Sequence, residues 1–289
     1  MNIISYTTSG LGNRLRPLAA CYAISKSCDR KLQAYWDQTT FDGCLADFNE
    51  LFENELQTIT LEQMEQLKDC AVFSEGGAAH SAEKEYFRFG RESLKKLGAK
   101  YGLRDWNSFN SSCNNENVII YHNNFLPNVD INLSLEYIRS LKPTQQIREK
   151  IDEQSELLKL NRNVVGIHAR GTDFDIAGEK PSITPYIEAM NQVLAENPWS
   201  TFFLSTEDKA FETEIREKYG SKVKVYEKDF YRKEDPDKGW AYNFKITKSH
   251  AQDAVVDMFL LAKTDIRIFR AESTFCEIAR ILANGAGGI

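Results

Sequence analysis

The sequence predicts an α/β protein with largely parallel sheets, on the evidence of its hydrophobic pattern and its composition. Short apolar runs of strand length alternate with longer amphipathic runs of helix length along the 289 residues, which is typical of βαβ units. In the second half this β-α step occurs four times in a row, which predicts one doubly wound domain. With 42% hydrophobic and 27% charged residues, the chain has the composition of a globular protein, with length for one large domain or two smaller ones.

The first half predicts four strands and three helices, separated by polar loops. The strands are expected at residues 2–8, 31–36, 70–73 and 118–122, and the helices at 17–27, 61–67 and 83–97. A highly charged helical segment at 144–160 follows Pro143 and has the character of a bridge between domains. We therefore expect an N-terminal α/β domain at residues 1–143 and a C-terminal α/β domain at residues 144–289.

The pattern is cleaner beyond this segment. Strands are expected at 164–169, 201–205, 222–226 and 266–269, and helices at 184–196, 209–219, 251–264 and 274–283. Pro185 suits a helix start because its fixed φ is already helical, and Gly220 suits a helix end. A long aromatic and charged loop is expected at 228–250.

Charge and composition exclude several classes of protein. A net charge of −6 argues against general binding of nucleic acid, whose readers usually carry a basic surplus. No apolar stretch reaches the ~20 residues that span a bilayer, and no signal-peptide pattern is present. We therefore expect a cytoplasmic protein. Peripheral contact with a membrane and the oligomeric state are left open. The six cysteines form no C-x-x-C pair, and the four histidines lack metal-ligand spacing, so we expect reduced structural thiols and no metal.

The segment "SGLGNRLRPLA", residues 9–19, lies between the first expected strand and helix. Its two glycines favour close approach of the backbone to an anion, as in a dinucleotide-binding loop. However, Leu15 stands where that fingerprint needs a third glycine. An NAD(P)-dependent oxidoreductase acting on a nucleotide sugar stays as an alternative, with Asp37 as the acid after the second strand.

The segment "VVGIHARGTDF", residues 164–174, places polar residues at the end of a strand. His168 and Arg170 share one face of the strand because side chains alternate. Ligands of parallel α/β sheets bind beyond the carboxyl ends of strands, where an arginine fork suits a phosphate. The alternative is a structural Arg170–Asp173 ion pair, with His168 as a core histidine.

Two further strand ends carry hydroxyl and acidic side chains. Ser273 and Thr274 open the last helix, whose N-terminus would attract an anion; the alternative is a capping box of Thr274 with Glu277. The segment "STED", residues 205–208, either lines the same site or caps the next helix.

Two acids lie one turn apart on the expected helix 251–264. A carboxylate there could accept hydrogen bonds from N1–H and the exocyclic amine of guanine, which adenine cannot offer. Asp257 is flanked by Val256, Met258 and Phe259, so we expect it to point inward, whereas Asp253 is expected on a solvated face.

Four segments resemble, in the same order, the shared motifs of the GDP-fucose-dependent fucosyltransferase superfamily. They are "GLGNRL", "HARGTD", "STED" and "DMFLLAKTDIRIFRAESTF". That superfamily contains the α-1,6-fucosyltransferases, including the bacterial nodulation enzyme NodZ, and the α-1,2- and protein O-fucosyltransferases. The resemblance implies a GT-B-like fold: two Rossmann-like α/β domains that face each other across a cleft, with the donor bound mainly by the second. Residues 30–160 carry no such motif.

The resemblance also implies roles for matching residues. Arg170 matches an arginine that grips the β-phosphate of the donor, and His168 a histidine beside the nucleotide. Asp257 matches the aspartate that recognises guanosine, and Ser273 and Thr274 match a pair on the diphosphate. The further donor-binding positions expected are Gly12, Asn13, Arg14, Thr206 and Phe275.

One departure concerns the motif around Arg170. The α-1,6 enzymes carry a second arginine next to the first, and here that position is Gly171, so the linkage cannot be carried over. The general base is also open among Asp173, Asp175 and Glu179, of which we favour Asp173 as a catalytic residue. Candidate platforms for the acceptor sugar are aromatic residues of the loop 228–250, namely Tyr231, Trp240 and Tyr242.

The implied activity is transfer of a sugar, most simply L-fucose, from a GDP-sugar to a hydroxyl of a glycan or glycoconjugate. We expect inversion at the sugar and no metal, because arginine and a helix N-terminus would stabilise the departing diphosphate, and no D-x-D motif is present. The alternative in another class is a non-catalytic protein that binds a GDP-sugar.

Overall fold

The computed structural model describes residues 1–8, 10–36, 44–74, 90–105, 109, 116–121, 125–126, 128–171, 181–230, 232–233, 244–245 and 247–285. The chain divides into two compact units. Unit 1 comprises Met1–Asp42 and Asp47–Lys142, and unit 2 comprises Gly43–Ala46 and Pro143–Ile289. Each unit is built around its own parallel sheet and is described by itself.

The described part of unit 1 has a parallel sheet in the order β3-β2-β1-β6-β4-β5. Its strands are β1 (Asn2–Thr7), β2 (Lys31–Trp36), β3 (Gln57–Thr58), β4 (Cys70–Ser74), β5 (Leu103–Asp105) and β6 (Asn117–Tyr121). Its helices are α1 (Leu11–Ser27), α2 (Phe48–Leu51), α3 (Leu61–Glu65), α5 (Gly90–Tyr101) and α6 (Ile131–Arg139).

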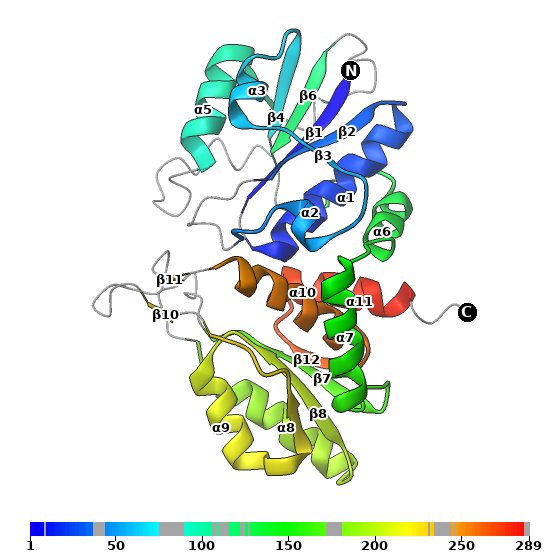
Figure 1. Cartoon of the computed structure of the whole chain (residues 1–289), viewed down its shortest axis with the longest axis vertical. Helices are drawn as coiled ribbons and strands as arrows, with labels where there is room; N and C mark the ends of the chain where they lie inside the picture. Colours follow the sequence, from blue (N-terminus) through cyan, green and yellow to red (C-terminus); the bar gives the residue numbers. More distant parts are fainter. Residues whose placement is uncertain are drawn as a thin grey trace. The chain divides into compact units, whose positions relative to one another are not determined.

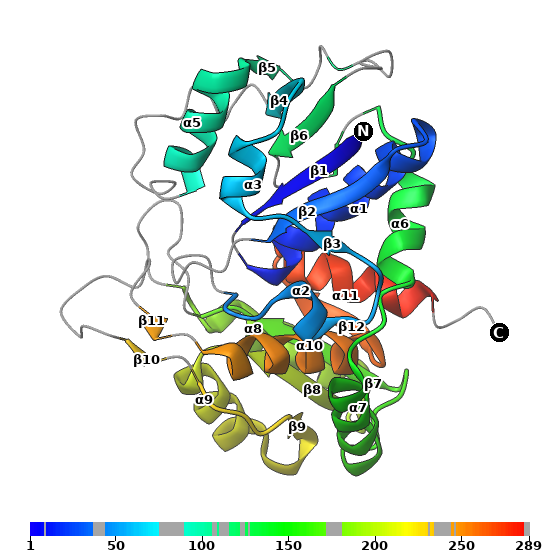
Figure 2. The ribbon, with the colours of Figure 1, turned by 45° about the horizontal axis from the view of Figure 1, so that its top comes forward.

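Helices cover both faces of this sheet, because successive strand residues point to opposite sides. Ile3 of β1 packs in a cluster with Ala20 and Ile24 of α1, whereas its neighbour Ile4 packs in a cluster with Met64 of α3 and with α5. Accordingly, α3 and α5 lie on one side of the strands and α1 and α6 on the other (Figures 1 and 2).

The described part of unit 2 has a parallel sheet in the order β12-β7-β8-β9. Its strands are β7 (Val164–Ala169), β8 (Thr201–Thr206), β9 (Val223–Val225) and β12 (Asp265–Phe269), with a separate antiparallel pair, β10 (Arg232–Lys233) and β11 (Phe244–Lys245). Its helices are α7 (Gln145–Leu157), α8 (Thr184–Glu196), α9 (Lys209–Tyr219), α10 (Lys248–Ala262) and α11 (Thr274–Gly285), with the 3-10 turn η5 (Gly220–Lys222).

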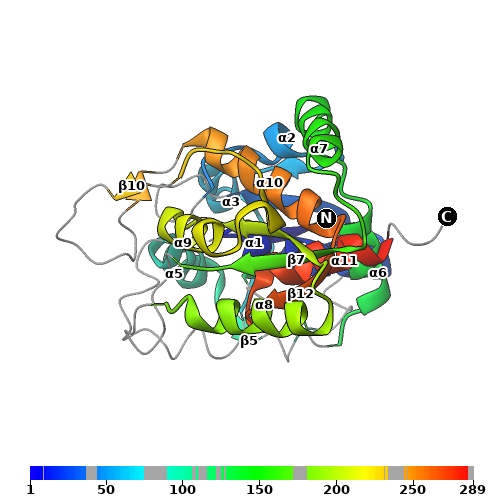
Figure 3. The same ribbon diagram turned by 90° about the horizontal axis from the view of Figure 1, so that it is seen from below.

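The strand order of unit 2 reverses next to β7. The chain runs from β7 to β8 and β9 on one side, and then returns to place β12 on the other side of β7. Figure 3 shows β12 next to β7. In open α/β sheets, ligands bind at the carboxyl ends of the two strands that flank such a switch point. The carboxyl ends of β7 and β12 are therefore the part of unit 2 where the fold favours a site.

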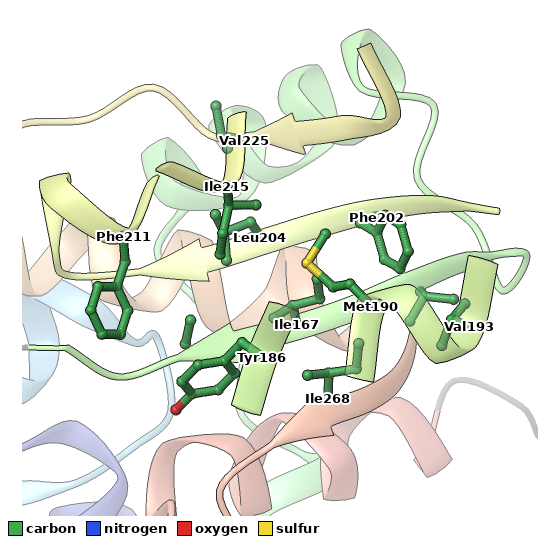
Figure 4. Close-up of a cluster of buried hydrophobic side chains, with 12 residues drawn as sticks. Ile167, Tyr186, Met190, Val193, Phe202, Leu204, Phe211, Ile215, Val225 and Ile268 are labelled. Atoms are coloured by element: carbon green, nitrogen blue, oxygen red, sulfur yellow. The ribbon is translucent and has the colours of Figure 1, made fainter. Parts of the chain in front are cut away.

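The core of unit 2 lies between the sheet and the helices α8 and α9. Ile167 of β7 and Leu204 of β8 pack there against Tyr186 and Met190 of α8 and Ile215 of α9 (Figure 4). Helix α10 packs on the sheet and against α11, so the sheet lies between α8/α9 and α10/α11 (Figure 1).

The α/β class with parallel sheets is confirmed, and the elements of the second half lie within three residues of their predicted bounds at almost every end. Helix α1 is the main difference, because it begins at Leu11 and not at Pro17. Leu11, Leu15 and Leu18 are buried at helical spacing, so the apolar face starts before the proline. Their burial outweighs the one backbone hydrogen bond that Pro17 cannot donate.

The sequence did not indicate the short elements β3, β5, α2 and α6. Of the expected helix 83–97, residues 83–89 lie outside the described residues, and α5 extends to Tyr101. Within the part of the chain that the structure describes, no helix has the length and apolarity that crossing a bilayer requires.

Candidate functional site

The candidate site in unit 2 is centred on His168, near the carboxyl end of β7. The side chain is 6% exposed and lies on the face of the sheet opposite Ile167 and Ala169, which pack in the core with α8. Its imidazole stacks on the ring of Phe275 in α11, with 4.9 Å between the ring centroids and 20° between the planes. The sequence-predicted residues His168 and Phe275 are thus in direct contact.

A hydrogen bond joins this imidazole to the start of α11. The hydroxyl oxygen of Ser273 lies 3.0 Å from Nδ1 of His168 and accepts a hydrogen bond from the backbone N–H of Cys276 at 3.2 Å. With its oxygen engaged as an acceptor, the hydroxyl has its proton to donate to Nδ1. In that arrangement the imidazole proton is on Nε2.

Burial keeps this imidazole neutral. The pKa of His168 is lowered from 6.5 to about 4, mainly by desolvation on burial; the charge of Glu207 opposes this shift, and the charges of Arg170 and Lys228 add to it. A base with a pKa of about 4 is weak at neutral pH. The geometry therefore suits His168 to position a ligand and the helix start, and not to remove a proton from an acceptor.

Ser273 is the N-cap of α11. Its side chain accepts from Cys276 and its carbonyl accepts from the N–H of Glu277 at 3.0 Å. The alternative of a capping box formed by Thr274 and Glu277 is therefore wrong, because the N-cap is Ser273, one residue before Thr274. The N–H groups of Thr274 and Phe275 fall in the first turn, where an α-helix offers no internal acceptor, and their dipoles favour an anion.

Backbone hydrogen bonds fix the loop that carries Arg170. The N–H of Arg170 donates to the hydroxyl of Tyr186 at 3.2 Å, and the N–H of Gly171 donates to Oε1 of Glu207 at 3.0 Å. A Cβ at Gly171 would lie 2.5 to 2.8 Å from three side-chain atoms of Asp208. The position after Arg170 therefore has no room for a second arginine unless Asp208 moves.

The segment 205–208 caps the next helix. Oδ1 of Asp208 accepts from the N–H of Ala210 at 2.7 Å and of Phe211 at 3.3 Å, which makes it the N-cap of α9. Oγ1 of Thr206 accepts from the N–H of Asp208 at 3.1 Å, and Thr206 is 3% exposed. Thr206, predicted as a donor ligand, thus shapes this turn in the structure.

Asp257 on α10 is 3% exposed, as expected of an inward residue. Its Oδ2 forms an ion pair with the ammonium of Lys228, whose side chain is 11% exposed. Among the described residues, its Oδ1 is buried without a hydrogen-bond partner. Burial lowers the pKa of Lys228 to about 8, with Glu207 opposing the shift.

Asp253, one turn before Asp257, is buried and not on a solvated face. Its Oδ1 accepts from the hydroxyl of Tyr226 at 2.5 Å and from the ammonium of Lys150 at 2.8 Å. The expectation of a solvated Asp253 is wrong because α7, which carries Lys150, packs against α10 and covers this face.

Lys228 was not among the predicted site residues. The sequence assigns it to the loop 228–250, but its charge acts on His168 and its ammonium pairs with Asp257, 29 residues away. It therefore links Asp257 to the cluster around His168. The sequence could not indicate this pair, because Lys228 and Asp257 are too far apart in the chain to form a recognisable spacing pattern.

In unit 1, the segment "GLGNR" forms the N-cap and first turn of α1 and not a loop. Gly12 is buried and Asn13 is partly exposed. The guanidinium of Arg14 lies 5.1 Å from the ring centroid of Trp36 and donates to the carbonyl of Thr7, with the side chain fully buried. Arg14 thus packs within unit 1, and its contact with the donor stays a prediction.

Several predicted residues cannot be placed. They lie outside the described residues and comprise Asp37, Asp173, Asp175, Glu179, Tyr231, Trp240 and Tyr242. Among the residues that are described, no group of three or more His, Cys, Asp or Glu side chains has the spacing to hold a metal ion. A metal-independent reaction stays a prediction.

Comparisons with known proteins give one family and one fold. The family model of nodulation protein Z (NodZ) matches residues 1–286. NodZ α-1,6-fucosyltransferase soaked with GDP-fucose has a TM-score of 0.62 at 19% identity, over 97% of this chain and 92% of its own. Fucosyltransferase NodZ from Bradyrhizobium scores 0.61 at 18% identity, over 97% and 92%. POFUT1 in complex with GDP-fucose scores 0.58 at 13% identity, over 99% and 95%.

No curated protein sequence matches the chain. At these identities the structural likeness shows the fold, and it confirms the predicted GT-B-like α/β class.

Proposed function

The chain belongs to the nodulation protein Z (NodZ) family of glycosyltransferases, and we propose that it moves fucose from GDP-fucose to a hydroxyl of a glycan acceptor. The observation that supports this most is the cluster at the switch point of unit 2. There, a neutral imidazole, a helix N-terminus and an arginine-bearing loop meet at the carboxyl ends of β7 and β12. That arrangement suits a nucleotide diphosphate.

We assign the donor contacts as follows. The diphosphate is bound by the guanidinium of Arg170 and by Ser273, Thr274 and the first-turn N–H groups of α11. The stacked pair of His168 and Phe275 supports the nucleotide, and Asp257 accepts hydrogen bonds from guanine. Gly12, Asn13 and Arg14 of unit 1 stay predictions from the resemblance alone.

The proposed reaction inverts the configuration at the sugar. The acceptor hydroxyl attacks the anomeric carbon while the bond to the β-phosphate breaks, so negative charge grows on the departing GDP. Arg170 and the positive end of α11 would stabilise that charge where it develops, an effect of about 3 kcal/mol for one well-placed donor. In this proposal, these groups take the place of a metal.

A general base would take the proton of the acceptor hydroxyl. We keep Asp173 as the first choice, with Asp175 and Glu179 as alternatives, because all three follow Arg170 closely in the sequence. His168 is not proposed for this step, since its lowered pKa makes it a weak base.

A thermal-shift panel of nucleotides tests the proposed donor. GDP-fucose and GDP should raise the melting temperature of the full chain, while ADP and UDP at the same concentration should not, because binding to the folded state alone stabilises it. A protein stabilised equally by all diphosphates would contradict recognition of guanine. No stabilisation by GDP-fucose at millimolar concentration would contradict the proposed function as a whole.

Slow hydrolysis of GDP-fucose without an acceptor separates an enzyme from a non-catalytic binding protein. We expect wild type to release free fucose and Arg170→Ala to do so at least about 100-fold more slowly, since one transition-state contact is lost. The melting temperature of the variant should stay close to wild type. Arg216→Ala, which removes an exposed arginine on α9, is the control and should keep the wild-type rate. Near wild-type turnover by Arg170→Ala would overturn the phosphate-binding assignment.

A further inference from the structure

The pair of Lys228 and Asp257 has features that stability does not account for. The lysine side chain is 11% exposed and the carboxylate 4%, so both charges have left water. Buried ion pairs are often no more stabilising than apolar residues of the same volume, because desolvation cancels the attraction. A buried pair in a proposed ligand site therefore calls for a functional explanation.

The second feature is the vacant acceptor on the carboxylate. Oδ1 of Asp257 is buried and, among the described residues, has no hydrogen-bond partner. An unsatisfied buried acceptor costs about 1–3 kcal/mol, and such groups are rare in folded proteins. A hydrogen-bond donor brought by a ligand would remove that cost.

The pair presents two acceptors followed by a donor. Oδ1 of Asp257 can accept a hydrogen bond, and Oδ2 has a second lone pair beside the one that Lys228 uses. The ammonium of Lys228 has three N–H groups, one of which donates to Asp257. The Watson–Crick edge of guanine presents the complementary order: the exocyclic amine, N1–H and the O6 acceptor. Adenine has an amine at the O6 position and an acceptor at N1, so it mismatches both groups.

We propose that Lys228 is a specificity-determining residue that donates a hydrogen bond to O6 of the guanine base while Asp257 accepts from the exocyclic amine and N1–H. This inference rests on the proposed function, because it assumes that the base of a GDP-sugar lies against Asp257. It adds a third hydrogen bond to the base and assigns it to a residue outside the motifs of the sequence. The cation also holds Oδ2 in place before the ligand arrives.

The neighbouring pair provides a matched control. Lys150 of α7 forms an ion pair with Asp253, which lies one turn before Asp257 on α10, but the lysine side chain is 46% exposed and Asp253 also accepts from Tyr226. Lys150→Met therefore removes a lysine from a similar aspartate without removing the proposed donor to O6.

The test combines protein variants with one change in the ligand. Dissociation constants are measured by calorimetry for GDP and 6-thio-GDP, in which a weakly accepting sulfur replaces O6. Wild type and Lys150→Met should bind GDP at least about 10-fold more tightly than 6-thio-GDP, since a hydrogen bond to a charged group is lost. Lys228→Met should bind GDP about 10- to 100-fold more weakly than wild type does, and its preference for GDP over 6-thio-GDP should be less than about 2-fold.

A merely structural role for Lys228 would give a different result. Both ligands would then lose affinity equally in Lys228→Met, and an unchanged preference for GDP would overturn the inference. If that variant does not fold, Lys228→Gln retains an amide donor toward Asp257 but lacks the reach and charge of lysine, and the same loss of preference is expected. If wild type binds no GDP, the proposed function itself is overturned. If wild type binds GDP and both Lys228 variants keep the wild-type preference for GDP over 6-thio-GDP, only this inference is overturned.

Discussion

The imidazole of His168 shows how one residue can serve both packing and a site. It stacks on Phe275 like a core aromatic, yet its Nδ1 is tied to the hydroxyl that caps α11. An apolar ring could replace the stacking but not the hydrogen bond. The burial and contacts expected of a core histidine are thus present, and the role of His168 in binding the donor stays a proposal.

The lowered pKa of His168 predicts how stability changes with pH. Its pKa is about 4 in the folded protein and near 6.5 in the unfolded chain, so the unfolded state takes up the proton first as the pH falls. The stability that the neutral imidazole contributes is complete above pH 6.5 and is lost as the pH falls toward 4. Between pH 7 and pH 5 the loss should be about 2 kcal/mol.

Urea unfolding of wild type and His168→Asn at both pH values measures this contribution. The asparagine keeps a polar atom near Ser273 but does not titrate. The variant should be less stable than wild type at pH 7, and the gap should be about 2 kcal/mol smaller at pH 5. A gap that is the same at both pH values would show that His168 is not held neutral by burial.

The sequence could predict those residues of the candidate site whose position follows from their neighbours in the chain. His168, Arg170 and Ser273 lie next to strand ends or helix starts, so their neighbours in the chain reveal their position. Lys228 and Gly171 do not, because their roles depend on Asp257 and Asp208, which meet them only in the folded unit. The stacking of Arg14 on Trp36 was not predicted for the same reason, since it joins two separate elements.

At the scale of elements, long periodic segments were predicted well and short ones were not. Helices α8 and α9 have the bounds that the sequence indicates, because each has an apolar face and a clear start or end. Strands β3 and β5 have two and three residues, too few for a period of two to appear. Their position comes from pairing with β2 and β4, which is tertiary information.

The packing of α10 and β12 on β7 depends on a glycine. A Cβ on Gly166 would be closer than van der Waals contact to Oγ1 of Thr264 and 3.3 Å from Cα of Ile266. We expect Gly166→Ala to lower the free energy of unfolding by about 1–3 kcal/mol, because the core cannot take an extra methyl group without shifting. Urea unfolding at pH 7 measures the change.

A background without the Thr264 hydroxyl tests this cause. In Thr264→Ala the closest atom is gone, so adding Gly166→Ala should cost less than half of what it costs in wild type. Equal costs in the two backgrounds would mean that Thr264 is not the obstacle and that the strand itself resists the substitution.

At the scale of the whole molecule, the chain matches known fucosyltransferases over 97% of its length at 19% identity. Most side chains therefore differ, and the information about function is confined to short segments. Those segments predict the donor side of the chemistry, in unit 2, more fully than the acceptor side. The acceptor candidates Tyr231, Trp240 and Tyr242 lie outside the described residues, so no contact of theirs refines the prediction.

In the proposed function, unit 2 binds the guanine base of a GDP-sugar through Asp257. The most direct measurement is calorimetric binding of GDP and ADP to the full chain and to Asp257→Asn. Asp253→Asn is the matched control, since it alters a buried, paired acid one turn away on the same helix.

We predict that wild type and Asp253→Asn bind GDP in preference to ADP. Asp257→Asn should bind GDP about 10- to 100-fold more weakly and lose most of that preference, because an amide cannot accept both N–H groups of guanine. Unchanged affinity of folded Asp257→Asn for GDP would show that Asp257 does not bind the guanine base.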